Sequence, residues 1–229
     1  DVAGKKVEEE LKKAGVRLQP AFIFTQPDLY AEYSYIDLLV ESLKEHDAIP
    51  VAVGSGTIND LTKLSSHLTG RRYMCVATAA SMDGYTAFGA SITAEGAKQT
   101  FSCPAPLAVL ADTNIIRKAP GVMTASGYAD LFAKVTAGAD WILADWMGVE
   151  KIDETAWSIV QDGLHDALAN PEGAAAGDDE AISQLIEGLM LGGFAMQWSK
   201  SSRPASGAEH QFSHLWNMEH HLNNGEHIS

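Results

Sequence analysis

Two histidines near the end of the chain have a spacing that suits a ligand or a metal ion. The polar, turn-prone residues 201–207 lead into a helical pattern that carries His210 and His214. Residues four apart on a helix lie on one face, so both imidazoles are expected to point in the same direction. Imidazole binds metals and carries protons near neutral pH. The alternative for such a pair is an ordinary solvated helix face.

The segment before the histidines supplies groups that bind anions. Arg203 lies among three serines, Ser201, Ser202 and Ser206. A guanidinium grips a phosphate through two parallel hydrogen bonds, and hydroxyl groups add further donors. The pattern therefore favours a site for a small phosphorylated molecule beside the histidines.

A glycine-containing turn in the first half of the chain forms a second candidate site. The apolar run 49–53 is expected to be a strand, and it leads into a helix through Gly54, Ser55, Gly56, Thr57 and Ile58. Glycines let the backbone approach a phosphate, and the first turn of a helix offers free N–H groups to an anion. The spacing matches neither GxGxxG nor the phosphate loop of NTPases, so a tight connection is the alternative.

A second polar turn is expected beside the first. It follows the apolar run 73–78 and contains Thr78, Ala79, Ala80 and Ser81, then Asp83. Open α/β sheets bind ligands at the carboxyl edge of their strands, where both turns would lie.

The elements around these turns alternate between strand and helix. We expect helices over 4–15 and 33–46, and strands over 18–28, 49–53, 73–78 and 107–112. Such alternation predicts βαβ units and a parallel sheet covered on both faces. A helix at the start of this pattern normally follows a strand, so we also expect a strand before residue 1.

The composition shifts at about Asp112, after which the patterns are helical. Helices are expected from Pro120 through 128–145, 155–169 and 179–199, with residues 170–179 as a mobile loop. The sequence therefore predicts an α/β unit over residues 1–113 and a helical unit over residues 114–229.

The composition excludes several classes of function. The chain has 229 residues, 46% of them hydrophobic, and a net charge of -14, which disfavours binding to nucleic acids and anionic membranes. Neither a signal peptide nor a run of about 18 apolar residues is present, so we expect a cytoplasmic protein without membrane insertion. Cys75 and Cys103 lie in apolar contexts and are expected to be buried.

Four motifs together resemble the sn-glycerol-1-phosphate dehydrogenases. In chain order they are GSGTxND, TAxSMDGYT, the GxxDLxxK pattern that begins at Gly127, and SSRPASGxEHxxSH. That family shares a superfamily with glycerol dehydrogenase, iron-containing alcohol dehydrogenases and dehydroquinate synthase. The resemblance implies a Rossmann-like dinucleotide-binding domain followed by an all-helical metal-binding domain, with the site between them. It implies NAD(H) or NADP(H), one divalent metal, and a homo-oligomer. Zinc is the expected metal, and nickel or iron accepts the same ligands.

The resemblance also implies roles for residues in the second half. Asp130 and His210 correspond to metal ligands, and Asp83, Asp130 and His214 to groups that contact the substrate during catalysis. Lys134 is expected either to reach the substrate phosphate or to pair with Asp130 four residues earlier. Arg203 is the stronger phosphate candidate.

On the cofactor side, the resemblance assigns the pyrophosphate to the turn from Gly54 to Ile58 and a second nucleotide contact to Thr78, Ala79, Ala80 and Ser81. Ala87 stands where many members carry a serine that touches the cofactor. We expect a lost hydrogen bond there, which is worth about 1 kcal/mol.

The third metal ligand is not evident in the sequence. The family carries a further histidine followed by glycine, whereas His220, His221 and His227 are followed by other residues. We therefore expect that ligand just beyond Ser229. The implied reaction interconverts dihydroxyacetone phosphate and sn-glycerol 1-phosphate. The alternatives are a glycerol dehydrogenase, a lyase of the dehydroquinate synthase type, and a catalytically incomplete fragment.

Overall fold

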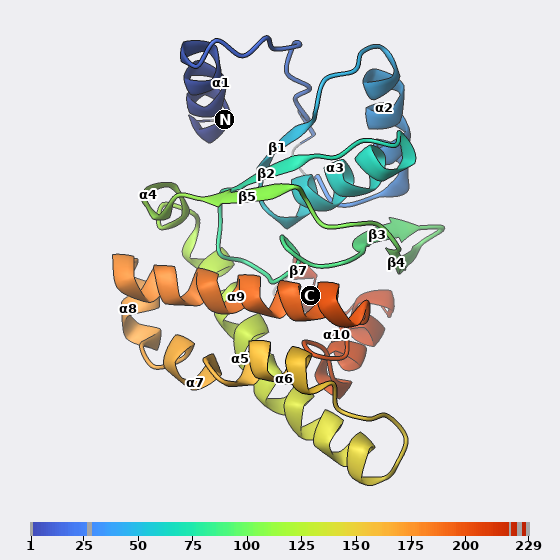
Figure 1. The fold of residues 1–229 in the computed structure, drawn as a ribbon, viewed down its shortest axis with the longest axis vertical. Helices are drawn as coiled ribbons and strands as arrows, with labels where there is room; N and C mark the ends of the chain where they lie inside the picture. The colour runs from blue at the N-terminus through green and yellow to red at the C-terminus, as the bar shows by residue number, and fades with distance from the viewer. Residues whose placement is uncertain (1, 27–28, 220, 224–225, 228–229) are drawn as a thin grey trace.

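A parallel sheet lies at the centre of the first half of the chain. The computed structural model describes residues 2–26, 29–219, 221–223 and 226–227. The strands of the sheet, in spatial order, are β1 (Val51–Gly54), β2 (Met74–Ala77) and β5 (Ala108–Ala111) (Figure 1). The parallel sheet expected from the alternating pattern is confirmed.

One face of this sheet is buried against the helical half. Ala52, Cys75 and Val109 lie opposite one another in register and share this face. Ala52 and Cys75 belong to the largest buried cluster, together with Leu131 and Leu185 of two long helices, and Val109 packs against it. Alternate residues of a strand point to one face, which is why three apolar residues in register make a continuous surface.

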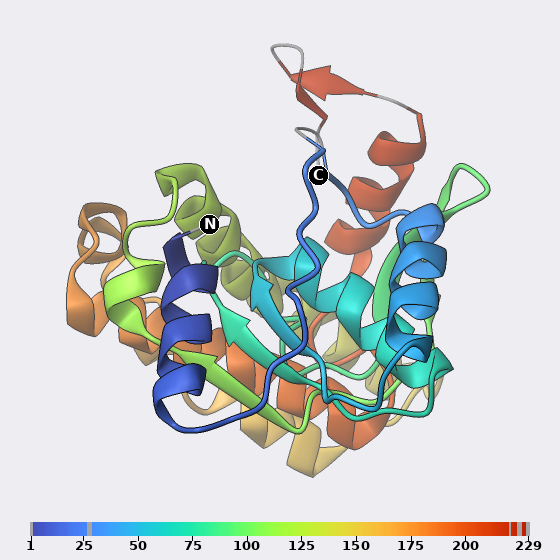
Figure 2. The same cartoon turned by 90° about the horizontal axis from the view of Figure 1, so that it is seen from above.

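Three helices accompany the sheet. They are α1 (Val2–Lys13), α2 (Tyr33–Lys44) and α3 (Gly56–Leu68). Figure 2 shows α1 (dark blue) to one side of the strands and α2 with α3 to the other. On the sheet face that carries Met74 and Leu110, apolar side chains stay accessible, and Leu110 is 58% exposed. The expectation that both faces are covered is met on one face and in part on the other, where Val76 is 6% exposed.

The structure contains a hairpin that the sequence analysis missed. β3 (Ala90–Ala94) and β4 (Ala97–Phe101) pair antiparallel through Glu95 and Gly96, both of which have positive φ. Two positive-φ residues make the tight turn that matches strand twist. The missed signal is that Glu-Gly turn, directly after the β-prone residues 90–94. Cys103, which follows β4, is buried as predicted.

The expected buried strand at residues 18–28 is wrong for the residues that the structure describes. Residues 18–26 form no strand, and Ile23 is 70% exposed. An apolar run becomes a strand only where a neighbour accepts its backbone hydrogen bonds. Here Thr25 N–H instead donates to the Gln26 side chain. Pro27 and Asp28 lie outside the described residues.

Helices dominate the second half, as expected. They are α4 (Thr113–Ile116), α5 (Gly121–Trp146), α6 (Glu154–Gln161), α7 (Leu164–Ala167), α8 (Pro171–Ala176), α9 (Asp179–Ser199) and α10 (Ala208–Met218). α9 (orange in Figure 1) lies under the sheet and packs against α4 through α8. The last strands are the short β6 (Leu222–Asn223) and β7 (Glu226–His227).

The expected mobile loop at residues 170–179 is instead partly helical. Asn170 Oδ1 accepts a hydrogen bond from Gly173 N–H at 2.8 Å and caps the start of α8. Gly177 ends the helix with a φ of 73°. An asparagine cap, a proline in the first turn and a terminal glycine are ordinary helix signals, and their short spacing hid them.

The largest buried cluster joins both halves of the chain. Ala52 and Tyr73 from the first half share it with Ile116 and Leu131 from the second. The division into domains at residue 113 therefore stays a prediction. Across the residues that the structure describes, no helix combines the length and apolar character needed to cross a membrane.

Candidate functional site

The expected site residues meet because α5 approaches the loop after β2 very closely. A Cβ atom at Gly127 would lie 2.0 Å from the carbonyl oxygen of Ala80. Glycine alone permits this approach. One turn later, Asp130 Oδ2 accepts a hydrogen bond from Asp83 N–H at 2.9 Å. The resemblance placed both carboxylates at the site, and the structure brings them together.

Lys134 completes a buried charge cluster. Its Nζ lies 2.6 Å from Asp83 Oδ2 and 2.8 Å from Asp130 Oδ1, and its side chain is 0% exposed. Of the two expectations for Lys134, the structure shows the pair with Asp130 and adds Asp83. Its ammonium is already engaged by two carboxylates, so its placement does not favour a direct phosphate contact, which stays a prediction.

The cluster separates the pKa values of the two carboxyl groups. Burial and the negative charge of Asp130 raise the pKa of Asp83. Burial also opposes ionisation of Asp130, but hydrogen bonds and charge from His210 and Lys134 outweigh it and lower its pKa to about 2. Asp130 is therefore the group that stays ionised and suits a cation.

α10 is anchored so that His210 faces Asp130. Ala208 N–H donates to Asp140 Oδ2 at 2.7 Å, which ties the first turn of α10 to α5. A Cβ at Gly207 would lie 2.6 Å from that Asp140 oxygen and 2.8 Å from Ala137 Cα, so only glycine allows the contact. His210 Nε2 then lies 3.6 Å from Asp130 Oδ1.

Glu209 fixes the other side of the imidazole, and the sequence analysis gave it no role. Its Oε1 lies 2.8 Å from His210 Nδ1 and also accepts the N–H of Gly207 at 2.8 Å. The adjacent carboxylate of Asp130 raises the pKa of His210 against the effect of burial, and Glu209 adds to the increase. A carboxylate directly before a histidine in a first helical turn is the signal that was available.

His214 lies on the same face of α10, as predicted. Its ring centroid is 6.5 Å from that of His210. Burial lowers its pKa, and the positive charges of Lys98 and His210 lower it further. A neutral imidazole one turn from the charge cluster suits hydrogen bonding to a substrate.

The expected phosphate-binding turn lies at the start of α3. Ser55 is the N-cap residue, but its side chain makes no capping hydrogen bond, so it leaves the first-turn N–H groups to other acceptors. A Cβ at Gly54 would lie 2.6 Å from Ile58 Cγ1, and one at Gly56 would lie 3.0 Å from Met82 Cε. The glycines thus allow close packing, and the uncapped helix start fits an anion such as a pyrophosphate.

Three of the expected cofactor residues are buried. The side chains of Ala79, Ala80 and Ala87 are at most 5% exposed, and Ala79 O accepts the hydroxyl of Tyr85 at 2.9 Å. Thr78 and Ser81 keep partial exposure. Burial leaves Ala87 little surface for a cofactor, because it packs with Met196 and Ala205. The cofactor contacts of all five stay predictions.

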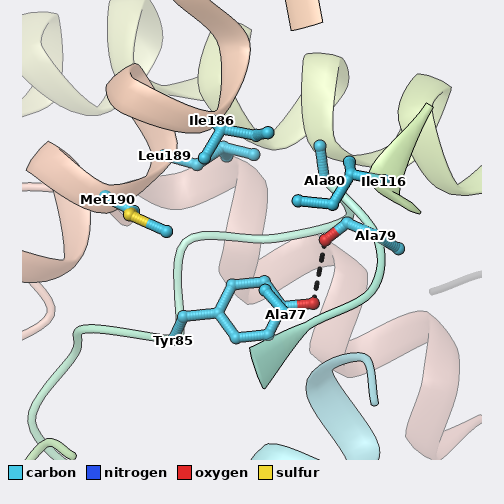
Figure 3. Close-up of a pocket in the computed structure, with 8 residues that line it drawn as sticks. All are labelled: Ala77, Ala79, Ala80, Tyr85, Ile116, Ile186, Leu189 and Met190. Carbon is cyan, nitrogen blue, oxygen red and sulfur yellow. Dashed lines mark hydrogen bonds between the residues drawn. The ribbon is translucent and has the colours of Figure 1, made fainter. Parts of the chain in front are cut away.

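A small cavity lies beneath this loop (Figure 3). Its volume is about 10 Å³, which is close to the space for one water molecule. Its lining is Ala77, Ala79, Ala80, Tyr85, Ile116, Ile186, Leu189 and Met190. The cavity is too small for a nucleotide or a triose phosphate.

Arg203 lies apart from the charge cluster. Its Nε is 3.0 Å from Glu150 Oε2, and it lines a groove of about 420 Å³ with Asp140, Met147 and Gln211. Neither carboxylate of the charge cluster nor His210 lines this groove. A phosphate contact for Arg203 stays a prediction. It requires Arg203 to leave Glu150 and turn to the substrate.

Comparisons with known proteins show the family of this chain. A sequence profile described as iron-containing alcohol dehydrogenase matches residues 1–120. The chain belongs to the iron-containing alcohol dehydrogenase family. It is also 36% identical over 220 residues to a glycerol-1-phosphate dehydrogenase (NAD(P)+) of Geobacillus thermodenitrificans, covering 95% of this chain and 54% of that protein.

A second relative supports the family, and a solved structure shows the fold. A glycerol-1-phosphate dehydrogenase (NAD(P)+) of Pyrococcus furiosus is 36% identical over 218 residues, covering 95% of this chain and 62% of the relative. The crystal structure of an iron-containing alcohol dehydrogenase from Thermotoga maritima shares the fold, with a TM-score of 0.72 and 15% identity. It covers 96% of this chain and 63% of that one. The chain thus spans little more than half the length of the relatives it matches.

The metal that the family name implies fits Asp130 and His210. Ligand atoms at about 2.1 Å from a tetrahedral ion lie roughly 3.4 Å apart, close to the observed 3.6 Å between Nε2 and Oδ1. Glu209 accepts from Nδ1, the arrangement that leaves Nε2 free for a metal. No third histidine, cysteine or carboxylate completes such a group within the described residues.

The later histidines do not supply the missing ligand in the described part of the chain. His221 Nε2 lies 2.8 Å from Glu219 Oε2, near the end of α10. His220 and the side chain of His227 lie outside the described residues. A third ligand beyond Ser229 stays a prediction.

Proposed function

We propose that the protein containing this chain interconverts dihydroxyacetone phosphate and sn-glycerol 1-phosphate, with NAD(P)(H) and a divalent metal. The observation that carries the proposal is the convergence of Asp83, Asp130 and His210 near one edge of the parallel sheet. Relatives named glycerol-1-phosphate dehydrogenase (NAD(P)+), at 34–36% identity, support the substrate and the cofactor.

Each element of the site has a role in this proposal. A nicotinamide cofactor would supply the hydride, and a divalent ion would polarise the carbonyl oxygen of the substrate. Asp130 and His210 hold the ion. The uncapped first turn of α3 binds the pyrophosphate through its N–H groups. Thr78 and Ser81 lie at the carboxyl end of β2, where the nucleotide would pass.

Reduction adds a hydride to the carbonyl carbon and a proton to its oxygen. His214 is the group placed to orient a substrate hydroxyl or to relay that proton, since its lowered pKa favours a neutral ring. Asp83 orients the substrate from the other side, while Lys134 holds its carboxylate in place.

The first test is turnover by the full-length protein. We expect NADH or NADPH oxidation with dihydroxyacetone phosphate, and much less with unphosphorylated dihydroxyacetone. A preference for free glycerol or dihydroxyacetone would instead indicate a glycerol dehydrogenase. Absence of turnover with any of these substrates would contradict the proposal.

The metal assignment is tested with variants of one helix. Asp130→Asn should abolish stoichiometric metal and lower turnover by orders of magnitude. Asp145→Asn is the matched control, because Asp145 lies on the same helix and pairs with Lys151. Full metal occupancy in Asp130→Asn, measured by elemental analysis, would exclude Asp130 as a ligand.

The phosphate contact is tested with Arg203 and its partner. If Arg203 leaves Glu150 to bind phosphate, Arg203→Ala should lower kcat/KM for dihydroxyacetone phosphate about a hundredfold and barely affect unphosphorylated dihydroxyacetone. Glu150→Gln should not reduce kcat/KM. Equal losses on both substrates in Arg203→Ala would show that Arg203 only supports its loop.

The proposed function also includes a cytoplasmic location and self-association of the protein.

A further inference from the structure

Lys63 is a buried cation that the proposed reaction does not use. It lies on α3, its residue is 1% exposed, and its ammonium is enclosed by backbone oxygens. Nζ donates to Gly84 O at 2.8 Å, to Ala87 O at 3.0 Å and to Gly89 O at 3.0 Å. An ammonium has three N–H groups, and each finds one carbonyl in the loop after Asp83.

This arrangement does more than fill space. A buried ammonium loses its hydration, and its nearest carboxylate oxygen, Asp60 Oδ1, is 3.9 Å away. An apolar side chain of similar length would fill the volume without that loss. The three charged hydrogen bonds instead fix the direction of the chain at residues 84–89, because each carbonyl must point at one atom.

Two further residues of α3 hold this loop and the first residues of β3, which follows it. Asn59 Nδ2 donates to Gly84 O at 3.4 Å, and Asp60 Oδ2 accepts from Ser91 N–H at 3.2 Å. Tyr73 holds Asn59 through a 3.0 Å bond from its hydroxyl to Asn59 Oδ1. We name Asn59, Asp60 and Lys63 the loop clamp.

The clamp joins the two functional parts of the site. α3 begins at the turn that would bind the pyrophosphate, and the clamped loop begins directly after Asp83. On its far side, Asp83 contacts Asp130 and Lys134 on α5, and Gly192 and Gly193 let α9 pack closely against it. The clamp therefore links a shift of α3 to the loop that follows Asp83, which α9 holds at Thr86 through hydrogen bonds to Met190 O and from Gln197 Nε2.

We propose that Lys63 is a positioning residue that couples the start of α3 to Asp83, so that dinucleotide binding at α3 orders the carboxylate that meets the substrate. This inference rests on the proposed function for the identity of both ligands. In this proposal Asn59 and Asp60, the last two residues of the GSGTxND motif, hold the loop and do not contact the nucleotide.

The test uses hydrogen exchange in the full-length protein. NADH added to the wild type should slow amide exchange across residues 84–91, and Lys63→Met should remove at least most of that protection. Lys44→Met is the matched control, since Lys44 is an exposed lysine that pairs with Glu41, and it should behave as the wild type. If Lys63→Met does not fold, Lys63→Gln, which keeps an amide donor, takes its place.

Kinetics separate positioning from a general loss of structure. Lys63→Met should lower kcat with dihydroxyacetone phosphate at least tenfold while changing the KM for NADH less than threefold. In an Asp83→Asn background the same substitution should cost less than threefold, because the group it positions is already altered. Multiplicative effects of the two substitutions would overturn the proposal.

The two proposals fail differently. A wild type that binds NADH but does not reduce dihydroxyacetone phosphate contradicts the proposed function, while NADH-dependent protection of residues 84–91 still supports the clamp. A wild type without that protection overturns the clamp, whatever its turnover.

Discussion

Glu209 determines which nitrogen of His210 faces Asp130. It accepts a hydrogen bond from Nδ1 at 2.8 Å and is itself held by the N–H of Gly207. A ring held in this way presents Nε2 to a cation without further rearrangement. Loss of a residue that hydrogen-bonds a metal-binding histidine in this way commonly lowers metal affinity by about 10- to 100-fold. Glu209 therefore belongs to the proposed metal site as the residue that orients His210.

Glu209→Ala should lower metal affinity by about 10- to 100-fold and leave the fold intact, because the imidazole loses the group that orients it. Titration of the metal-free, full-length protein with zinc, nickel or iron(II) would measure the change. Glu219→Ala is the matched control, since Glu219 also pairs with a histidine, His221, near the end of α10. A loss of the same size in both variants would contradict the role of Glu209.

At the scale of elements, glycines set how closely the helices approach the sheet loops. Gly127 brings α5 against the carbonyl of Ala80, and Gly193 brings α9 so close that a Cβ would lie 2.1 Å from Thr86 Oγ1. Glycine inside a helix costs roughly 1 kcal/mol relative to alanine. At Gly127 this cost is offset by a closer contact between α5 and the loop after β2, which brings Asp130 to Asp83.

Gly127→Ala should therefore destabilise the protein by about 1 to 3 kcal/mol, because the added methyl group meets backbone and not a flexible side chain. It should also weaken metal binding, since Asp130 lies one turn away. Gly121→Ala is the control on the same helix. Nothing lies within 4 Å of its added Cβ, so it should be neutral or slightly stabilising. Chemical denaturation measures the free energy of unfolding of both variants. Equal changes in Gly127→Ala and Gly121→Ala would refute the packing argument.

At the scale of the whole molecule, sequence patterns predicted the elements that bury apolar residues. β1, β2 and β5 are short apolar runs, and α5 and α9 have long helical patterns. The hairpin of β3 and β4 was missed because β4, with Lys98 and Gln99, is largely exposed and lacks an apolar run. Residues 18–26 were misjudged because strand formation depends on a partner that the local sequence does not contain.

That these candidate residues lie close together was predictable from the sequence, but their hydrogen-bond and ion-pair partners were not. The resemblance brought Asp83, Asp130 and His210 together, and the structure places them in one cluster. It could not show that Lys134 is enclosed between two carboxylates or that Arg203 pairs with Glu150. These contacts depend on how α5, α9 and α10 pack, which spacing along one helix does not determine.

The shared core predicts that the two halves of this chain unfold together. Leu185 of α9 is fully buried in the cluster that contains Ala52 and Cys75 of the sheet, so neither half completes its core alone. Leu185→Ala should cost about 2 to 5 kcal/mol. In the full-length protein, hydrogen exchange in increasing denaturant should show residues 51–77 and 181–199 opening at one common, lowered midpoint. Leu38→Ala, at a half-exposed position of α2, should shift that midpoint little. Two separate midpoints would favour independent domains divided at residue 113, because destabilising α9 would then leave the sheet unaffected.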